Sequence, residues 1–552
     1  MEWLIGLASR GAAPNPARGP SSSGHLKPRG EGDDHPLPGA GQSPAGLAVA
    51  VTPPAVANLG RSTAAGFLWL LLPSLSGRVA SFVSQLVLAR LLLPEAFGQI
   101  GMAYTVTTLA GALISFGIDD VLLQRLRTFK MWASPAFWSS LALSLLGMAL
   151  MLAAAPVAER LYHSPDLFGL VAVLAVALPI AALSTVPYVK LRAAMDFRFL
   201  ATYSSGEMLG VQVASVALAA LGCGAYSFVL PVPFAAAVKA MVFWRKAPTR
   251  IRPRFRRRQI NHFVSSGFLV LGTRLIVEAV NQGGYVVLGL MATDTVVGVY
   301  FFAFRLAAQP LRMLAGNFGA VLFPAFTQLR AEPERQEAAA LRASRVLAFL
   351  VTPVCFLQAA LAAPALHLMF GARWNGAIPL MQVLSLGLPG DAVAWVAGAL
   401  LVARREFLRD FILLAAFSPP FFVFVLAGAY LGSSLGVAIG ASLYYALVKP
   451  INSWLVLRRS MGLGDFMEVY VAPPLLAGAA MGAAYAVSLL TGRALATGQA
   501  LAQIAVIAAL GPLAYLALLR LLLPGILREI LDRFPVDTMI RRLARRLTRK
   551  GV

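Results

Sequence analysis

The sequence is poor in the residues on which several protein classes depend. Its 552 residues include two cysteines, Cys223 and Cys355, and five scattered histidines. Two cysteines cannot form a disulfide framework, and no Cys/His spacing typical of a metal site is present. The chain also lacks a GxxxxGK[ST] phosphate-binding loop and the HExxH and GxSxG motifs. We therefore expect a protein that is not an enzyme, with no catalytic residues, no metal and no cofactor.

Acidic residues are scarce as well. The 24 Asp and Glu residues face 47 Lys and Arg residues, which gives a formal net charge of +23. Such an excess is found in nucleic-acid-binding proteins, but here the basic residues lie in loops and tails between apolar segments. Basic loops of this kind mark the cytoplasmic side of membrane proteins. We therefore expect no nucleic-acid partner.

Long hydrophobic runs make up most of the chain. Hydrophobic residues account for 58% of it, and between residues 64 and 523 they form helix-length runs. A membrane-spanning helix needs roughly 20 such residues, because the hydrocarbon core of a bilayer is about 30 Å thick. The runs predict an all-α polytopic membrane protein with about fourteen transmembrane helices, at 64–87, 98–118, 136–157, 167–189, 201–222, 225–244, 263–290, 296–324, 345–370, 376–402, 410–431, 434–457, 468–490 and 498–523.

The loops predict orientation and domain boundaries. Basic residues concentrate in alternate loops, above all at 245–258, so these loops and both termini are expected in the cytoplasm. The first sixty residues are rich in Pro, Gly and Ser, which predicts disorder. The expected organisation is a cytoplasmic tail (1–60), an N-lobe (61–244), a basic linker (245–262), a C-lobe (263–457), two further spans (458–523) and a basic cytoplasmic tail (524–552) that lies on membrane lipid.

Two segments 200 residues apart resemble one another. Residues 87–103 (VLARLLLPEAFGQIGMA) align without gaps with residues 287–303 (VLGLMATDTVVGVYFFA), and Gly98 matches Gly298. Six predicted spans separate the copies, so both enter the membrane in the same direction. The repeat predicts two six-helix lobes related by a pseudo-two-fold axis along the membrane normal, plus two C-terminal helices, with the substrate path between the lobes.

Polar residues recur at helical spacing inside four predicted spans. They are Ser74, Arg78, Ser81 and Gln85; Tyr104, Thr108 and Ser115; Arg274, Glu278, Asn281 and Tyr285; and Arg305, Gln309 and Arg312. A charge at the centre of a spanning helix costs at least about 2.5–3.5 kcal/mol, so we expect these faces to line a hydrated cavity. Its arginines favour an anionic ligand, because a guanidinium binds two phosphate oxygens at once. The structural alternatives are an Arg274–Glu278 ion pair and an interfacial Arg78.

Two further acidic residues lie inside predicted spans, Glu207 and Asp391. Acidic residues within membranes serve as proton or cation sites in pumps, so both are candidates for ion coupling. Hydrogen bonding to a neighbouring helix is the structural alternative.

Two blocks carry a resemblance to a known family. They are LVLARLLLPEAFGQIGMAYTVTTLAGALISFGIDDVLLQR (86–125), with Ala89, Arg90, Pro94, Phe97, Gly98, Gly117, Gln124 and Arg125, and GVYFFAFRLAAQPLRMLAGNFGAVLFPAF (298–326), with Tyr300, Ala303, Arg305, Pro310 and Pro324. The chain resembles the polysaccharide-biosynthesis flippases (Wzx-type O-antigen and exopolysaccharide exporters) of the multidrug/oligosaccharidyl-lipid/polysaccharide exporter superfamily. Relatives commonly carry an acidic residue where this chain has Gly283 and Gly284, which puts any coupling role of that acid in doubt here.

The resemblance implies a flippase in the bacterial inner membrane. It would move an undecaprenyl-pyrophosphate-linked oligosaccharide from the cytoplasmic to the periplasmic leaflet by alternating access. Arg78, Arg274, Arg305 and Arg312 would bind the pyrophosphate, and Ser74, Ser81, Gln85, Glu278, Asn281, Tyr285 and Gln309 would form the polar cavity that meets the sugars. Polysaccharide polymerase and glycosyltransferases are the implied protein partners.

Three alternatives differ in the ligand or in the activity. A multidrug exporter of the same superfamily typically carries cations, which would favour an acidic cavity. A non-transporting scaffold for polysaccharide-assembly enzymes would act through the basic cluster at 245–258. A membrane glycosyltransferase lacks support, because no acidic pair lies on a sizeable loop.

Overall fold

The computed structural model describes residues 81–526, apart from 115–117, 125–127, 165, 195, 253–256 and 491–496. The predicted disordered tail (1–60), the first part of the first span with Ser74 and Arg78, and almost all of the basic C-terminal tail (524–552) lie outside the described residues, as does Gly117. The linker prediction (245–262) is covered only in part.

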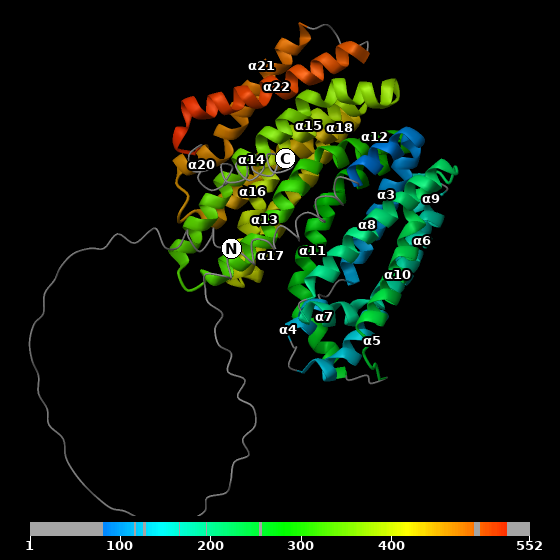
Figure 1. Ribbon diagram of the computed structural model, residues 1–552. Helices are drawn as coiled ribbons and strands as arrows, with labels where there is room; N and C mark the ends of the chain where they lie inside the picture. The colour runs from blue at the N-terminus through cyan, green and yellow to red at the C-terminus, as the bar shows by residue number, and fades with distance from the viewer. Residues whose placement is uncertain are drawn as a thin grey trace, which may run out of the picture. The chain divides into compact units, whose positions relative to one another are not determined.

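Every regular element in the described part of the chain is helical, which confirms the all-α prediction (Figure 1). A short helix, Ser81–Leu91, comes first. The N-terminal half continues with α3 (Pro94–Ile114), α4 (Ile118–Gln124), α5 (Phe129–Tyr162), α6 (Leu167–Ala182), α7 (Thr185–Ala193), α8 (Phe197–Ala220), α9 (Tyr226–Val229) and α10 (Pro231–Lys246).

The C-terminal half begins with a long helix and is interrupted more often. It contains α11 (Arg257–Met291), α12 (Asp294–Ala307), α13 (Gln309–Gln328), α14 (Pro333–Phe370), the 3-10 turn η2 (Gly371–Trp374), α15 (Ala377–Gly387), α16 (Pro389–Arg404), α17 (Phe407–Phe417), α18 (Pro419–Leu443), the π-helical turn η3 (Tyr444–Val448) and α19 (Lys449–Leu457). The chain continues through α20 (Leu463–Tyr470), α21 (Ala472–Leu489) and α22 (Thr497–Leu522). The last two helices pack against each other and against α14.

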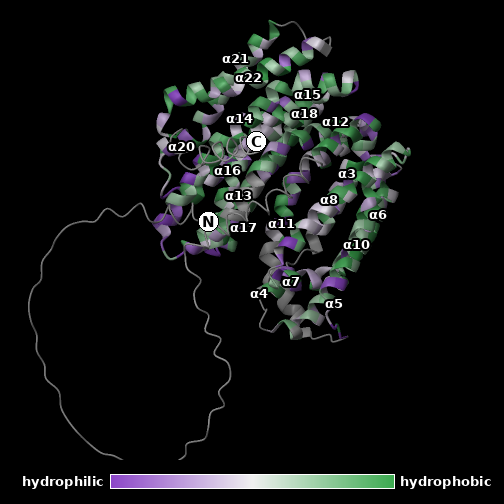
Figure 2. Cartoon of the chain, in the orientation of Figure 1, coloured by the Kyte–Doolittle hydropathy of each residue, from purple (hydrophilic) through white to green (hydrophobic). Residues whose placement is uncertain are grey.

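Seven helices of the described residues are long and apolar enough to cross a membrane, or eight if α6 and α7, bent by 47°, form one span. One of them, Phe407–Leu457, contains a kink at Gly432 and Ser433, where two of the predicted spans meet. Figure 2 shows hydrophobic residues along most of the helices. The protein is therefore a multi-pass membrane protein, while the number fourteen stays a prediction.

Prolines interrupt several of these helices, and side chains of neighbouring helices donate hydrogen bonds to carbonyl groups that the prolines leave free. A proline has no N–H, so it leaves the carbonyl four residues earlier without its donor. Pro187 frees the Leu183 carbonyl, which accepts a 2.8 Å hydrogen bond from Trp244 Nε1. Pro310 likewise frees the Leu306 carbonyl, which accepts a 2.7 Å bond from Gln358 Nε2. Such hydrogen bonds allow interrupted helices to exist in a membrane, where water cannot donate to the free carbonyl groups.

The two copies of the sequence repeat pack directly against each other. Helices α3 and α12 cross at Gly98 and Gly298, where neither residue has room for a Cβ. A Cβ on Gly98 would collide with the Asp294 carbonyl, and a Cβ on Gly298 would collide with the Pro94 carbonyl. Pro94 and Asp294 are themselves equivalent in the repeat, so the contact is reciprocal, as in a two-fold interface.

Further contacts surround this crossing at the end of the helices where α3 and α12 begin, which we term the junction. Trp374 Nε1 donates to the Ala89 carbonyl at 3.0 Å, and Arg90 Nε donates to the Met369 carbonyl at 2.7 Å. Both carbonyls belong to the last turn of a helix, where no intrahelical donor remains. Ser164 Oγ also donates to Asp294 Oδ2 at 2.9 Å. The junction thus joins the N-terminal and C-terminal halves with satisfied polar groups.

The contact between Gly98 and Gly298 is therefore reciprocal at positions that match in the sequence repeat. The relation of the complete lobes, and the predicted boundaries at 61–244 and 263–457, stay predictions.

We expect Gly98→Ala to lower the unfolding free energy by about 1–3 kcal/mol, because the added methyl group forces α3 and α12 apart. Thermal unfolding of the purified protein in detergent measures the change. Gly111→Ala is the matched control on α3, since a Cβ there meets nothing within 4 Å. Equal stability of the two variants would contradict the close helix crossing.

Candidate functional site

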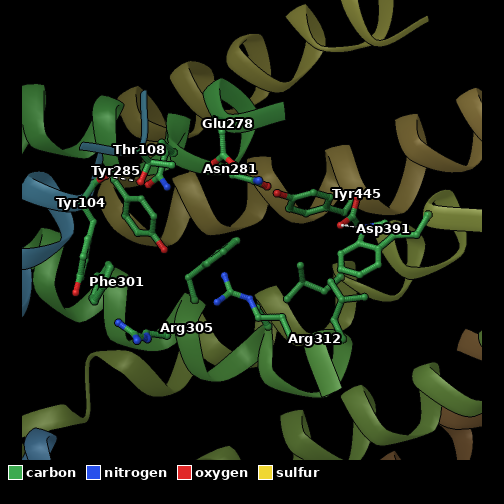
Figure 3. A pocket seen from close by; sticks show the side chains of 16 residues that line it. Tyr104, Thr108, Glu278, Asn281, Tyr285, Phe301, Arg305, Arg312, Asp391 and Tyr445 are labelled. Carbon is green, nitrogen blue, oxygen red and sulfur yellow. Dashed lines mark hydrogen bonds between the residues drawn. The ribbon is translucent and has the colours of Figure 1, made fainter. Parts of the chain in front are cut away.

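A cavity of about 410 Å³ lies among the helices, and polar residues from six segments line it. We term it the central cavity (Figure 3). Its lining consists of Tyr104, Thr108, Glu278, Asn281, Gln282, Tyr285, Phe301, Phe304, Arg305, Ala308, Leu311, Arg312, Leu388, Asp391, Trp395 and Tyr445. Its volume falls in the range of small-molecule binding sites, about 300–1,000 Å³.

Regular helical spacing brings the polar residues of α11 to one wall. Glu278, Asn281 and Tyr285 follow one another at steps of three and four residues, so they share a face of the helix. Gln282 lies on the same side, within 3.3 Å of Thr105 Oγ1 on α3. The predicted polar stripe of this span therefore does face the cavity, except for Arg274, which is exposed and does not line it.

The break between α12 and α13 places two arginines on another wall. Arg305 lies in the last turn of α12, and Arg312 lies in the first turn of α13. Between them, Pro310 ends the hydrogen-bond ladder, and Gln358 satisfies the carbonyl that it frees. Figure 3 shows both arginines on the side of the cavity opposite Glu278 and Asn281.

Arg305 lies in an environment that suits an incoming anion. Its guanidinium carbon is 5.6 Å from the centroid of the Phe301 ring, and its charge is repelled by Arg312. Among the residues that the structure describes, no carboxylate forms an ion pair with Arg305. Two neighbouring cations in a medium of low dielectric attract an anion far more strongly than they would in water.

A buried ion pair forms the third wall. Asp391 Oδ1 lies 2.9 Å from Lys449 Nζ, and both side chains are less than one-fifth exposed. Asp391 Oδ2 accepts a 3.3 Å hydrogen bond from Trp395 Nε1. The neighbouring Gly390 allows α16 to approach the Tyr445 carbonyl, because a Cβ there would collide with it. Lys449 follows directly on the π-helical turn η3, a kind of turn that is frequent at functional sites.

The Asp391–Lys449 ion pair changes the interpretation of Lys449 and of the charge of the cavity. From its position near a span end, Lys449 would be expected to extend to the membrane surface, but it is buried against Asp391. The described lining carries Arg305 and Arg312 against Glu278 and Asp391, so its charges are more evenly balanced than the sequence suggests.

The remaining candidate residues lie elsewhere. Ser81 accepts a 3.2 Å hydrogen bond from Gln212 Nε2 on α8, and Gln85 on the same short helix is buried. Gln309 begins α13 beside the cavity without lining it. Glu207 pairs with Lys239 at 3.2 Å, away from the cavity lining. Ser74 and Arg78 lie outside the described residues.

The segment at Gly283 and Gly284 has no room for an acidic side chain. A Cβ on Gly283 would come within 2.6 Å of the Phe421 ring, and a Cβ on Gly284 within 2.6 Å of the Tyr300 hydroxyl. Helix α11 therefore packs closely against its neighbours at Gly283 and Gly284.

Trp395 and Tyr445 were not found from the sequence. Trp395 follows Asp391 by four residues and therefore shares its helix face, a spacing that would have revealed it. Tyr445 offers no such signal, because only the folding of η3 brings it to the cavity.

Comparison with known proteins supports this architecture. Residues 87–379, more than half of the chain, match the sequence model of a family described as "Polysaccharide biosynthesis protein". The chain belongs to this family. The matched range includes α3, α11, α12 and α13, and with them most of the cavity lining.

Several curated proteins are similar to this member of the polysaccharide biosynthesis family. The succinoglycan biosynthesis transport protein ExoT of Rhizobium meliloti (strain 1021) is 29% identical over 309 residues, which cover 55% of this chain and 62% of that protein. The chain thus spans less than two thirds of ExoT. The lipopolysaccharide biosynthesis protein WzxC of Escherichia coli (strain K12) is 21% identical, covering 71% of this chain and 82% of that protein. The teichuronic acid biosynthesis protein TuaB of Bacillus subtilis (strain 168) is 23% identical, covering 75% and 86%.

Two solved structures share the fold of this family member. One is the lipid II flippase MurJ in an inward closed conformation, with a TM-score of 0.64 at 14% identity, covering 84% of this chain and 100% of that one. The other is an inward-facing multidrug resistance transporter of the MATE family, with a TM-score of 0.58 at 15% identity, covering 70% of this chain and 96% of that one.

We expect Lys449→Met to lower the unfolding free energy by about 3–5 kcal/mol, because it leaves Asp391 buried without its counter-charge. Adding Asp391→Asn should restore most of the loss, since the double variant buries no unpaired charge. Thermal unfolding in detergent measures both. If the effects of the two substitutions simply add, the pair is not coupled as described.

Proposed function

We propose that the protein is a flippase for undecaprenyl-pyrophosphate-linked oligosaccharides in surface polysaccharide biosynthesis. It moves the head group from the cytoplasmic to the periplasmic leaflet of the bacterial inner membrane, with both of its termini in the cytoplasm. Family membership, the transport and biosynthesis proteins among its relatives and the MurJ-like fold support this proposal.

The observation that carries the proposal is the position of Arg305 and Arg312 on a cavity inside a membrane bundle. A sugar-pyrophosphate cannot cross hydrocarbon unaided, because the desolvation of its charge is prohibitive. Paired guanidinium groups replace part of its hydration with charge-assisted hydrogen bonds. In our proposal, Arg305 and Arg312 bind the pyrophosphate, together with Arg78 and Arg274.

The junction suggests how the cavity alternates between the two sides. In the predicted orientation, α3 and α12 begin at the periplasmic side, so the contacts at Gly98, Gly298 and Trp374 close that side. The cavity then receives its substrate from the cytoplasmic side. Rocking of the two halves would separate the contacts of the junction and open the periplasmic side.

The source of energy remains a prediction. Glu207 and Asp391 are our candidates for ion coupling, and each is paired with a lysine, Lys239 and Lys449 respectively. In our proposal, a proton arriving at either carboxylate releases its lysine and thereby triggers rocking. Polymerase and glycosyltransferases are the protein partners that this function implies.

A multidrug exporter is the second candidate, and the fold shared with a MATE transporter favours it. Glu278 and Asp391 would be the carboxylates that attract a cationic drug. Against it stand Arg305 and Arg312, which would repel a cation from the same small volume.

We expect Arg305→Ala with Arg312→Ala to abolish export of the polymer in a strain that lacks its own copy. Each lost charge-assisted hydrogen bond costs about 1.5–3 kcal/mol, which is about tenfold or more in affinity. Lipid-linked oligosaccharide should then stay on the cytoplasmic leaflet, out of reach of a lectin added to spheroplasts.

Arg373→Ala is the control, because Arg373 is exposed in η2 and does not line the cavity. Normal lectin labelling and polymer export by a double variant that is present in the membrane at wild-type level would refute the proposal. Loss of drug efflux with unchanged polymer export would transfer the support to the multidrug exporter.

A further inference from the structure

Trp395 is the most exposed aromatic residue of the described cavity lining. Its side chain is 39% exposed, whereas Tyr285, Phe301 and Tyr445 are each less than one-tenth exposed. The neighbours of Trp395 on α16, including Val393 and Val396, are buried. A large apolar ring thus lines the cavity beside polar groups without being covered by neighbouring side chains.

The polar edge of this ring is already occupied. Trp395 Nε1 donates to Asp391 Oδ2 at 3.3 Å, and Asp391 Oδ1 is held by Lys449 at 2.9 Å. This chain of contacts orients the indole and leaves its apolar surface as the part that meets the cavity. The ring is therefore organised in advance as a flat binding surface.

The carboxylate of Asp391 can still accept hydrogen bonds. Its two oxygens offer about four lone-pair sites, and Lys449 and Trp395 use two of them. Because Lys449 balances its charge, this carboxylate offers acceptors without strongly repelling an anion elsewhere in the cavity. Figure 3 shows Tyr445 beside Asp391, with its hydroxyl directed toward Asn281.

The distribution of charge indicates what kind of ligand suits this wall. The arginines occupy one side of the cavity, while Glu278 and Asp391 occupy the others. A ligand that is anionic at one end matches the side with the arginines. If its other end is uncharged and rich in hydroxyl groups, that end matches the side with Glu278 and Asp391. A second anionic group on this side of the cavity would be repelled by Glu278.

We propose that Trp395, Asp391 and Tyr445 form a binding site for an uncharged sugar ring. Trp395 is the platform on which the C–H face of the ring stacks, because the negative face of an indole attracts polarised C–H groups. Asp391 accepts hydrogen bonds from sugar hydroxyls, and the Tyr445 hydroxyl contributes a further one. The inference rests on the proposed function, since the sugar is the one attached to the pyrophosphate that Arg305 and Arg312 hold.

The test measures the affinity of the full-length protein in nanodiscs for three lipids. They are undecaprenyl pyrophosphate, the same lipid carrying one neutral hexose, and the same lipid carrying one hexuronic acid. For the wild type we expect the hexose to tighten binding about tenfold, corresponding to about 1.4 kcal/mol, and the hexuronic acid to give no gain. Trp395→Leu should abolish the gain, so that the variant binds the hexose lipid no more tightly than it binds undecaprenyl pyrophosphate.

Two further variants separate stacking from a general structural effect. Trp395→Phe should keep most of the gain, because it retains an aromatic face. Trp454→Leu should leave all three affinities unchanged, since Trp454 is similarly exposed, at 37%, but does not line the cavity.

The outcomes distinguish the two proposals. If undecaprenyl pyrophosphate does not bind, or if its binding is insensitive to Arg312→Ala, the proposed function fails. If it binds but the hexose gives no gain, the gain survives Trp395→Leu, or the hexuronic acid binds as tightly as the hexose, the sugar site is overturned and the proposed function stands. The comparison of the three lipids uses only the wild-type protein, so its result does not depend on whether any variant folds.

Discussion

Every backbone polar group inside a bilayer must find its partner within the protein, and this constraint shapes the central cavity. The chain breaks a membrane helix at Pro310, and the break is tolerated because Gln358 on α14 satisfies the Leu306 carbonyl. The same break separates α12 from α13 and brings Arg305 and Arg312 to one wall. The hydrogen bond from Gln358 to the Leu306 carbonyl lies outside the cavity lining, yet the positions of Arg305 and Arg312 depend on it.

The second feature of the cavity is that its charged groups are compensated to different extents. A lone carboxylate in this environment would be costly, and the buried Lys449 removes that cost from Asp391 while Trp395 occupies its other oxygen. Arg305, by contrast, has no carboxylate partner among the described residues. The protein therefore compensates its charges unequally, and Arg305 lies where an anionic ligand would supply a counter-charge.

At the junction, two helices are in direct backbone contact, and polar contacts lie on either side of them. Two glycines allow α3 and α12 to touch backbone to backbone, and reciprocal contacts by Trp374 and Arg90 satisfy helix ends on either side. The junction also contains a buried aromatic cluster of Phe97, Phe302 and Trp374. In our proposal, both the polar contacts and this apolar cluster separate when the two halves change their relative position.

The helical class, the polar stripes and the repeat could be predicted from the sequence, because periodicity and apolar length are properties of neighbouring residues. The stripe of Glu278, Asn281 and Tyr285 does line the cavity. The repeat matches Gly98 with Gly298, and the structure adds that these two residues are in contact. Other features depend on residues far apart in the chain. Sequence alone could not show that Ser81 would meet Gln212, that Lys449 would pair with Asp391 or that Tyr445 would reach the cavity through η3. Local spacing determines which face of a helix is polar, whereas only the packing of helices against one another decides what that face meets.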